Sequence, residues 1–350
     1  MKILALDLGK SKTVACIFDS ELGIHSFTKV STRREELLRL LGRTPWDRVV
    51  MEIGPSAGWI HDLAVGMGLK VEVANVNHEA WRWRNVKCKT DRLDALKLAR
   101  LCAMGQVPLV HMPSPAVRQK RSLIEYRAKL VGRQTAIKNS VRAILVQQGL
   151  SLPGGKSGWT DKSLKALRAM AKPMETVGPE ELWRGQLSVE LEALAGVGGL
   201  VRQVSEHLNR LAEGNVPIAA LQTIVGIGVR TAEAVVAVID DPHRFKSKKQ
   251  VGSYIGLTPR KYQSGASDRQ GRISGQGNRL LRKLLVQSAW VAVKYSAWAR
   301  GVFQQVTRGV PGRRKIAIVA VARRLLIAAW AMLRDGTEWQ EPVARASAAG

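Results

Sequence analysis

The sequence predicts an α/β layer with a mixed sheet, followed by a mainly helical remainder. Within residues 1–105, short apolar runs bounded by turns alternate with helical patterns. Two long helical patterns follow between residues 113 and 213, and further apolar helical patterns flank a glycine-rich stretch after residue 221. The chain has 350 residues, and at about 150 residues per domain it is long enough for two or three domains.

The N-terminal region has the order of a three-stranded meander followed by alternating helices and strands. Strands are predicted at 3–8, 13–18, 24–30, 48–52 and 70–74, and helices at 35–41, 58–67 and 91–104. Thr90 is placed to cap the last of these helices, because a threonine hydroxyl accepts hydrogen bonds from the first free N–H groups. The order βββαβαβα favours helices packed on a mixed sheet.

The helical remainder has a break in its middle. Helical patterns at 113–150, 161–171 and 186–213 enclose a Gly/Pro/Ser-rich loop at 149–158, which predicts a coiled-coil-like arm over 106–220 that acts as spacer, dimer contact or both. The segment IVGIGVRTAEAVVAVID at 224–240 is similar to a helix-hairpin-helix, although an ordinary helical turn is as good an interpretation. Residues 242–280 are expected to be rich in loops, 279–300 and 315–333 to be helices, and 336–350 to be a flexible tail.

The charge balance indicates a polyanionic partner. Lys and Arg number 55 and Asp and Glu 28, which gives a net charge of +27. Basic proteins gain affinity for nucleic acid from counterion release and a faster encounter. Nucleic acid is therefore the leading partner, and an anionic membrane surface comes second.

Other compositional features restrict the class of protein. Three cysteines, Cys16, Cys88 and Cys102, show no CxxC spacing, so neither a disulfide framework nor a zinc ribbon is expected. The N-terminus has an acid at position 7, too early for a signal peptide, and Arg323 and Arg324 interrupt the most apolar late stretch. We expect no membrane association and a cytoplasmic protein, located at the nucleoid when bound to DNA.

Four acids at the ends of predicted elements indicate a metal site. Asp7 and Glu52 end predicted strands, and Asp91 and Asp94 lie three residues apart on one face of a helix. Singly, each has an ordinary interpretation as a turn residue or a helix-dipole partner. Together they would repel one another unless divalent cations neutralised them, and two Mg²⁺ ions about 4 Å apart are a common device for attack on a phosphodiester.

Basic residues gather in two stretches that are candidates for phosphate contact. The first contains Arg82, Arg84, Lys87 and Lys89, just before the two helical acids. The second, residues 256–283, contains Arg260, Lys261, Arg269, Arg272, Arg279, Arg282 and Lys283 together with Ser264, Ser267, Ser274 and Tyr262. A hydroxyl among arginines is placed to attack a phosphate, and the alternative is a loop that only grips the backbone.

These motifs together resemble the IS-one-ten (IS110) family of insertion-sequence transposases, also called DEDD transposases or bridge-RNA-guided recombinases. The resemblance covers about 1–335. It is carried by LALDLGK, VVMEIGPSAGW and KCKTDRLDALKLA at the N-terminal end, and by IVGIGVRTAEAVVAVID, YIGLTPRKYQSG and GRISGQGNRLLRKLL at the C-terminal end. One departure is Ser274-Gly275, where the family often has Ser-Lys.

The resemblance implies a RuvC-like (RNase H-type) domain at 1–105, a helical coiled-coil arm at 106–220 and a mainly helical serine transposase domain at 221–335. Asp7, Glu52, Asp91 and Asp94 match the family's DEDD metal ligands, which hold Mg²⁺, and Ser264 matches its nucleophilic serine. The implied reaction is DNA strand exchange through a covalent phosphoserine at one composite site. The implied partners are donor and target DNA, a noncoding guide RNA, and further copies of the chain as a dimer or tetramer.

Three other functions are compatible with parts of the sequence. A RuvC-type nuclease would use the four acids with water as the nucleophile and would leave the serine region unexplained. An actin-like sugar kinase is suggested only by the LDLGKSKT hairpin, without a second nucleotide loop. A non-catalytic nucleic-acid scaffold would use the helical hairpin and basic loop alone, and would tolerate loss of Asp7 or Glu52.

Overall fold

The structure is a computed structural model that describes residues 1–75, 90–155, 158–264 and 267–342. It divides into two compact units, Met1–Ala116 and Val117–Gly350.

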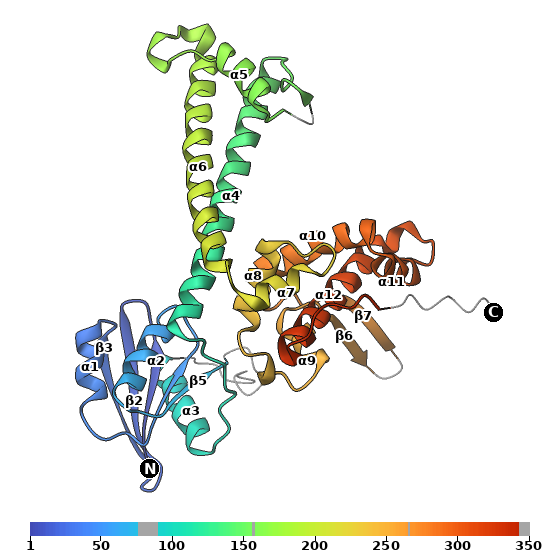
Figure 1. Cartoon of the computed structure of the whole chain (residues 1–350). Helices are drawn as coiled ribbons and strands as arrows, with labels where there is room; N and C mark the ends of the chain where they lie inside the picture. Colours follow the sequence, from blue (N-terminus) through green and yellow to red (C-terminus); the bar gives the residue numbers. More distant parts are fainter. Residues whose placement is uncertain (76–89, 156–157, 265–266, 343–350) are drawn as a thin grey trace, which may run out of the picture. The chain divides into compact units, whose positions relative to one another are not determined.

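The first unit contains a five-stranded mixed sheet in the order β3-β2-β1-β4-β5 (Figure 1). Its strands are β1 (Lys2–Leu8), β2 (Lys12–Asp19), β3 (Ile24–Ser31), β4 (Arg48–Glu52) and β5 (Val71–Ala74), and its helices are α1 (Arg34–Leu41), α2 (Ala57–Gly66) and α3 (Asp91–Ala103). β1 pairs antiparallel with β2, and β2 with β3, whereas β4 is parallel to both β1 and β5. The predicted mixed sheet and the predicted order of elements are confirmed.

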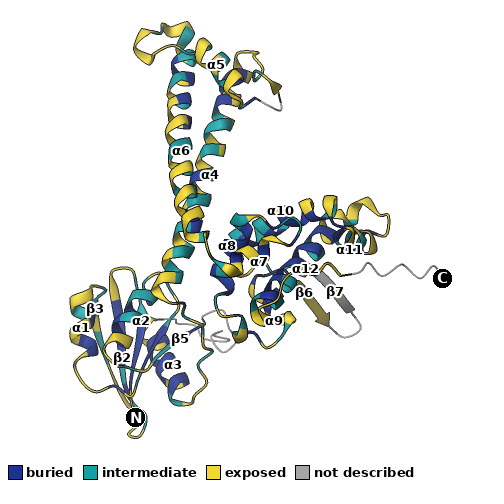
Figure 2. Cartoon of the chain, in the orientation of Figure 1, coloured by how far each residue is buried: buried dark blue, intermediate teal, exposed yellow. Residues whose placement is uncertain are grey.

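Helices cover both faces of this sheet. Leu4, Leu6 and Met51 point to the face that packs against α1 and α2. The alternate residues Ile3 and Ala5, with Val50 of β4, point to the opposite face and pack against α3. Since side chains alternate along a strand, burial on both faces makes β1 almost continuously apolar up to Asp7 (Figure 2).

The second unit begins with a long antiparallel helix pair. Its helices are α4 (Pro115–Gln147), α5 (Asp161–Met170) and α6 (Leu182–Ala212), with single 3-10 turns at Met174–Thr176 and Pro179–Glu181. Arg127 Nε donates to Ser205 Oγ at 2.7 Å, and Ser140 Oγ donates to Glu190 Oε1 at 2.7 Å. Numbers rise along α4 as they fall along α6, so the two helices run in opposite directions, as Figure 1 shows.

The rest of the second unit forms one helical body around a single large apolar cluster. Its elements are α7 (Val216–Gln222), α8 (Val229–Ile239), a 3-10 turn at Pro242–Arg244, α9 (Lys248–Tyr254), β6 (Pro259–Ser264), β7 (Ser267–Ile273), α10 (Arg279–Tyr295), α11 (Ala297–Thr307), a 3-10 turn at Pro311–Arg313 and α12 (Arg314–Asp335). α7 and α8 are joined by a tight turn at Gly226, where a Cβ would overlap the carbonyl oxygen of Ser288 on α10. This glycine therefore allows the turn to approach α10 closely.

The stretch at 242–280, expected to be rich in loops, also contains α9 and the antiparallel hairpin of β6 and β7, which were not predicted. One expectation for this body was wrong. Residues 279–300 are not one helix, because the helical conformation is interrupted at Ser296, between α10 and α11. The Ser296 side chain accepts a hydrogen bond from the N–H of Ala299 at 3.1 Å, which starts α11 anew.

The segment expected to be a flexible tail begins with docked residues. Trp339 packs edge-on against Trp298, with 5.5 Å between ring centroids. Glu341 accepts hydrogen bonds from Ser296 Oγ at 2.7 Å and from the N–H of Trp298 at 3.0 Å. These bonds lower the pKa of Glu341, and they tie the chain beyond α12 to the start of α11.

Among the described residues, one helix, Pro311–Asp335, is long and apolar enough to cross a membrane by length and composition alone. Half of its most apolar window is buried within the protein. Val321, Leu325 and Ala329 are fully buried in the large apolar cluster. A core helix has this same composition, and that is the role these contacts give it.

Candidate active site

Asp7 and Glu52 lie at the same edge and on the same face of the sheet. β1 and β4 are parallel and Leu6 pairs with Met51, so Asp7 and Glu52 occupy the next step on adjacent strands. By alternation, both side chains point to the face that carries Ala5 and Val50, which is the face covered by α3. Both acids are half-buried.

The remaining two acids occupy the first turn of α3. Thr90 caps this helix, and its hydroxyl accepts a hydrogen bond from the N–H of Leu93 at 3.3 Å. Asp94 is only 7% exposed, whereas Asp91 is exposed. The positive end of the helix dipole favours negative charge in this turn.

The direction of α3 brings this first turn toward Asp7 and Glu52. Cys102, near the C-terminal end of α3, lies beside Arg48 and Glu72, at the starts of β4 and β5. The N-terminal end of α3 is therefore directed toward the C-terminal ends of β1 and β4. The fold thus gathers acids from three separate elements at one edge of the first unit.

These carboxylates suit a hard divalent cation, because Mg²⁺ prefers oxygen ligands. Within the described residues, no three His, Cys, Asp or Glu side chains lie close enough together to hold a metal ion. The carboxylates therefore suit Mg²⁺ in ligand chemistry, but side-chain movement would be needed to bring them close enough to enclose an ion.

Neither described cysteine competes as a nucleophile. Burial raises the pKa of Cys16 to about 11 and that of Cys102 to about 12. Both thiols therefore stay protonated at neutral pH, and a thiol is a much weaker nucleophile than a thiolate.

The predicted basic residues before α3 cannot be placed. Arg82, Arg84, Lys87 and Lys89 lie outside the described residues. The C-terminal basic stretch is described in large part, and it begins with the β6–β7 hairpin.

Ser264 is the last residue of β6. It pairs with Ser267 across the hairpin, next to the pair formed by Gln263 and Asp268. Its side chain lies outside the part of the structure that is described. Tyr262, two residues earlier, is 58% exposed. The hairpin thus carries two candidate hydroxyl nucleophiles, Tyr262 and Ser264, close together in the strand.

Two glycines allow the loops at the base of this hairpin to cross. A Cβ at Gly256 would overlap the backbone of Gln276, and one at Gly277 would overlap the carbonyl oxygen of Tyr254. Both residues also have positive φ, 74° and 73°. The N–H of Ser274 donates to the carbonyl oxygen of Thr258 at 2.8 Å, which closes the crossing. The glycines of the GLTP and SGQGN segments are therefore required by backbone packing.

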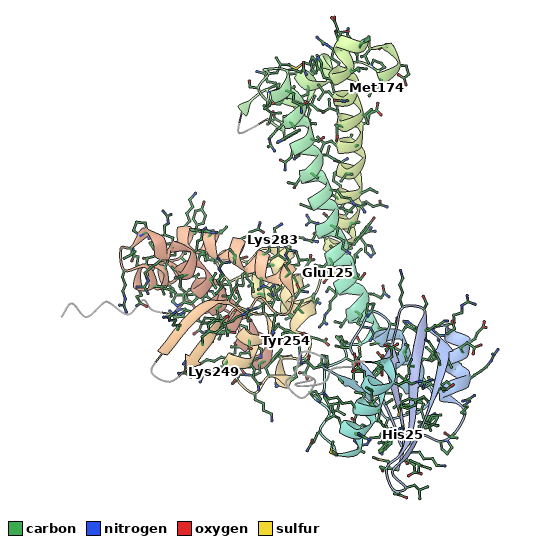
Figure 3. The ribbon with its side chains drawn as sticks, turned by 180° about the vertical axis from the view of Figure 1, so that it is seen from behind. His25, Glu125, Met174, Lys249, Tyr254 and Lys283 are labelled. Atoms are coloured by element: carbon green, nitrogen blue, oxygen red, sulfur yellow. The ribbon has the colours of Figure 1, made fainter. Side chains whose placement is uncertain are left out.

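Two of the predicted phosphate-binding arginines hold this crossing in place. Arg282 Nη1 donates to the carbonyl oxygens of Ile255 at 3.0 Å, Gly277 at 3.1 Å and Gln276. Arg260 Nη2 donates to the carbonyl oxygen of Ser274 at 3.2 Å. Desolvation lowers the pKa of Arg282, although the guanidinium remains charged. Arg279 and Lys283, the neighbours of Arg282 on α10, are exposed (Figure 3 labels Lys283).

Sequence reasoning missed two further arginines that organise this unit. Arg121 of α4 donates to the carbonyl oxygens of Ala237 at 2.6 Å and Val238 at 3.1 Å, at the end of α8. Arg244 donates to Ile239 at 3.1 Å and stacks on the rings of Phe245 and Tyr254. Positive groups at a helix C-terminus are favourable, but no local pattern in the sequence assigns Arg121 to a helix more than 100 residues away.

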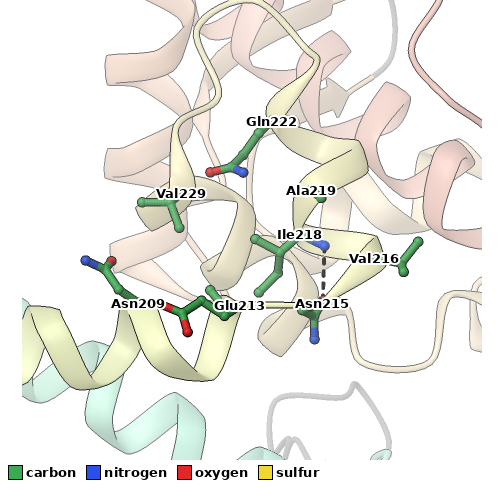
Figure 4. A pocket seen from close by; sticks show the side chains of 10 residues that line it. Asn209, Glu213, Asn215, Val216, Ile218, Ala219, Gln222 and Val229 are labelled. Carbon is green, nitrogen blue, oxygen red and sulfur yellow. Dashed lines mark hydrogen bonds between the residues drawn. The ribbon is translucent and has the colours of Figure 1, made fainter.

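A hollow of about 380 Å³ lies beside the turn between α6 and α7 (Figure 4). Its polar side chains include Asn209, Glu213 and Gln222, and no Lys or Arg lines it. Asn215 caps α7 there by accepting a hydrogen bond from the N–H of Ile218 at 3.1 Å. With one acid and no base, this hollow does not suit a phosphate.

Both ends of the chain match models of transposase families. Residues 4–149 match a model of DEDD transposases of the IS110 type, and residues 218–304 match the model described as "Transposase IS116/IS110/IS902 family". The first match contains all four acids, and the second contains Ser264 with the crossing loops.

Curated relatives are similar over most of the chain. The transposase for insertion sequence element IS1111A of Coxiella burnetii is 26% identical over 341 residues, covering 95% of this chain and 90% of the relative. A probable family 20 transposase of Pseudomonas aeruginosa is 30% identical over 258 residues, covering 71% and 74%. A pilin gene-inverting protein of Moraxella lacunata is 27% identical over 261 residues, covering 74% and 70%.

The two family matches, on a chain with a mixed sheet and a basic helical unit, identify the class of protein as a DNA-acting transposase. The chain belongs to the IS110 family of insertion-sequence transposases. This family supports an enzyme that cuts and rejoins DNA and implies the use of divalent metal.

Proposed function

We propose that the chain is an RNA-guided DNA transposase that exchanges strands through a covalent phosphoserine at Ser264. The observation that carries this proposal is that each of the two family matches contains one feature that the chemistry needs. One is the edge of the first unit where Asp7, Glu52 and Asp94 gather. The other is the rigidly crossed loop base that carries the Ser264 hairpin.

The proposed chemistry conserves the energy of the broken bond. Ser264 Oγ loses its proton and forms a bond to phosphorus, while the bond from phosphorus to one deoxyribose oxygen breaks and that oxygen takes up a proton. A hydroxyl of the new DNA partner then attacks the phosphoserine, and Ser264 regains its proton. Because one ester replaces another at each step, rejoining needs no ATP.

Asp7, Glu52, Asp91 and Asp94 are the residues that would hold Mg²⁺, with two ions per site. Bound Mg²⁺ supplies Lewis-acid stabilisation of the charge on the phosphate. The acids themselves serve to orient and retain that positive charge at the sheet edge. We propose that both units act on the same phosphate, in an assembly of two or four copies.

The proposal also includes a guide RNA and a division of the chain into domains. Residues 1–105 would form the RuvC-like domain, 106–220 the coiled-coil arm, 221–335 the serine domain, and 336–350 the tail. Sequence choice would lie in base pairing of a noncoding RNA with donor and target DNA. Sequencing of RNA that co-purifies with the chain, expressed beside its own flanking DNA, tests this part.

Trapping of the covalent intermediate tests the chemistry. Ser264→Ala should abolish protein–DNA adducts on a denaturing gel while DNA binding persists, and Ser267→Ala, its partner across the hairpin, should leave the adducts intact. Adducts that survive Ser264→Ala but disappear with Tyr262→Phe would make Tyr262 the nucleophile. Free 5′-phosphate and 3′-hydroxyl ends without attached protein would instead support a metal-dependent nuclease that uses water.

A further inference from the structure

A second, strongly basic hollow lies in the helical body of the second unit. It has a volume of about 870 Å³, at the upper end of the range of about 300–1,000 Å³ found for ligand pockets. It is lined by α9, by the base of the β6–β7 hairpin and by α12, and no described acidic residue lines it. Six basic residues surround it: Lys248, Lys249, Arg272, Lys315, Arg323 and Arg324.

One face of α12 supplies half of these basic residues. Ile316, Val319, Arg323 and Ile327 recur at intervals of three or four residues, so they lie along one side of the helix. The opposite side is buried in the core of the unit. Ile316 is 61% exposed and adds apolar surface to this face. This face is therefore both basic and apolar, and the described residues leave it open.

The six basic side chains form no ion pair with an acidic side chain among the described residues. None of their side chains forms an ion pair or a hydrogen bond there. Arg323 Nε is buried without a hydrogen-bond partner within that part of the chain, and a Cβ at Gly252 of α9 would lie 2.9 Å from it. Like charges around one hollow repel one another, and a bound polyanion removes that repulsion.

We propose that this basic hollow binds an unpaired nucleotide, together with its flanking phosphates, in a strand of DNA or RNA. The Lys and Arg side chains around the hollow suit the negatively charged phosphates. The aliphatic side chains of Leu257, Ile273 and Val319 suit the apolar face of a nucleobase. Guanidinium planes such as that of Arg324 are suitable surfaces for a base to stack on. A duplex would use only the rim, because its bases are stacked inside the helix.

The hollow shares an element with the proposed nucleophile. Pro259, which lines it, and Ser264 are the two ends of β6, five residues apart. At about 3.3 Å per residue this separation is roughly 17 Å. Resting on the proposed function, the inference is that the hollow holds a nucleotide roughly 17 Å from the cut phosphate, the separation between the two ends of β6.

Binding of labelled strands to the full-length protein tests this inference. Short fluorescent probes of one sequence are compared as single-stranded DNA, single-stranded RNA and duplex DNA by anisotropy over a salt series. The double variant Lys315→Gln/Arg324→Gln removes two rim charges. The matched control Arg308→Gln/Arg314→Gln removes two exposed charges outside the hollow. The hollow variant should weaken single-strand binding at least about tenfold and reduce the salt slope by about 1.4, at roughly 0.7 per phosphate. The control should weaken it by less than about threefold.

A charge-neutral variant isolates the floor of the hollow. Ala320→Leu narrows it without adding an aromatic surface, and should weaken single-strand binding about tenfold while changing duplex binding by less than about twofold, because nucleobases stack on aromatic and guanidinium planes and not on a leucine. If thermal unfolding shows that this variant is not folded, the two double variants decide the question.

Equal losses in the hollow and control variants would overturn the inference, as would equal losses for duplex and single strand. The inference would also be overturned if the hollow variant lost binding to phosphatidylserine vesicles, used as a further probe, but kept its binding to single strands. The tighter of the DNA and RNA single strands identifies the source of the nucleotide, and either result supports the proposal. Ser264→Ala should bind the strands like the wild type, so a failure of the serine chemistry and a failure of this site are distinguishable.

Discussion

Arg282 shows how a side chain that sequence assigns to phosphate serves the backbone instead. Its Nη1 group donates to carbonyl oxygens on both crossing segments, at Ile255 and at Gly277. The positive charge on the guanidinium strengthens these bonds relative to neutral ones. The arginines of the basic stretch therefore divide into those that build the loop and those that remain exposed.

Arg282→Ala should lower the free energy of unfolding by about 1–3 kcal/mol, because it leaves several carbonyl groups without their donor. Arg279→Ala, its exposed neighbour on α10, should change stability by no more than about 0.5 kcal/mol. Chemical denaturation measures both. Equal losses of stability in the two variants would show that the three carbonyl contacts do not support the crossing.

Glu233 is a buried acid within α8 with a raised pKa. It is 1% exposed and lies 3.2 Å from Arg230. Burial raises its pKa to about 6, against the attraction of Arg230, Arg127 and Lys120, which acts in the opposite direction. Between the ordinary glutamate pKa of 4.5 and about pH 6, the folded state therefore holds a proton that the unfolded state has lost.

The stability contribution of protonated Glu233 should therefore be complete below about pH 4.5 and lost as the pH rises through about 6. Glu233→Gln should gain about 2 kcal/mol relative to the wild type between pH 4 and pH 7, since one pKa unit corresponds to about 1.4 kcal/mol. Denaturation across this pH range measures the difference. Glu206→Gln, on the exposed side of α6, should run parallel to the wild type, and a parallel curve for Glu233→Gln would refute the assignment.

At the scale of elements, the crossing of the 254–258 and 274–278 segments depends on two glycines. Gly277→Ala should destabilise the protein by more than about 2 kcal/mol, because its Cβ meets the Tyr254 carbonyl and its φ is 73°. Gly301→Ala is a matched control in the middle of α11, where a new Cβ meets nothing within 4 Å.

That control should stabilise the protein by about 0.5–1 kcal/mol, because alanine favours the helix. Thermal unfolding compares the two variants, which differ from the wild type by the same methyl group. Similar effects of both alanines would mean that the crossing tolerates a side chain. The opposite signs predicted here depend only on where each glycine lies.

The elements differ in how far the sequence alone predicts them. The strands of the first unit were predictable, because runs such as residues 3–8 are apolar on both faces and end at turns. The β6–β7 hairpin was not, because PRKYQS and SDRQGRI are polar and lack an alternating pattern. The break at Ser296 had a local signal, a serine cap, which the continuous apolar pattern on either side obscured.

The candidate site was predictable in its residues but not in its geometry. The four acids are visible as strand and helix ends, whereas their common edge follows from the parallel pairing of β1 with β4, which no short pattern encodes. The docking of Trp339 and Glu341 likewise depends on contacts with α11, some 40 residues earlier. Long-range packing of this kind has no local signature.

For the whole molecule, the net charge of +27 indicates a polyanionic partner but does not say which basic residues make the contact. The guanidinium groups of Arg121, Arg244 and Arg282 donate hydrogen bonds to backbone carbonyl oxygens inside the second unit. The bases around the 870 Å³ hollow have no such partners among the described residues. Charge counted along the sequence therefore overestimates the surface that is available to phosphate.

We propose that the chain cuts DNA by forming a covalent bond through Ser264. Protease digestion of the trapped protein–DNA complex, followed by mass spectrometry of the nucleotide-bearing peptide, measures this directly. We expect a single modified peptide, with the phosphodiester on the Ser264 oxygen. A modified Tyr262, or cleaved DNA with no nucleotide on any peptide, would contradict it.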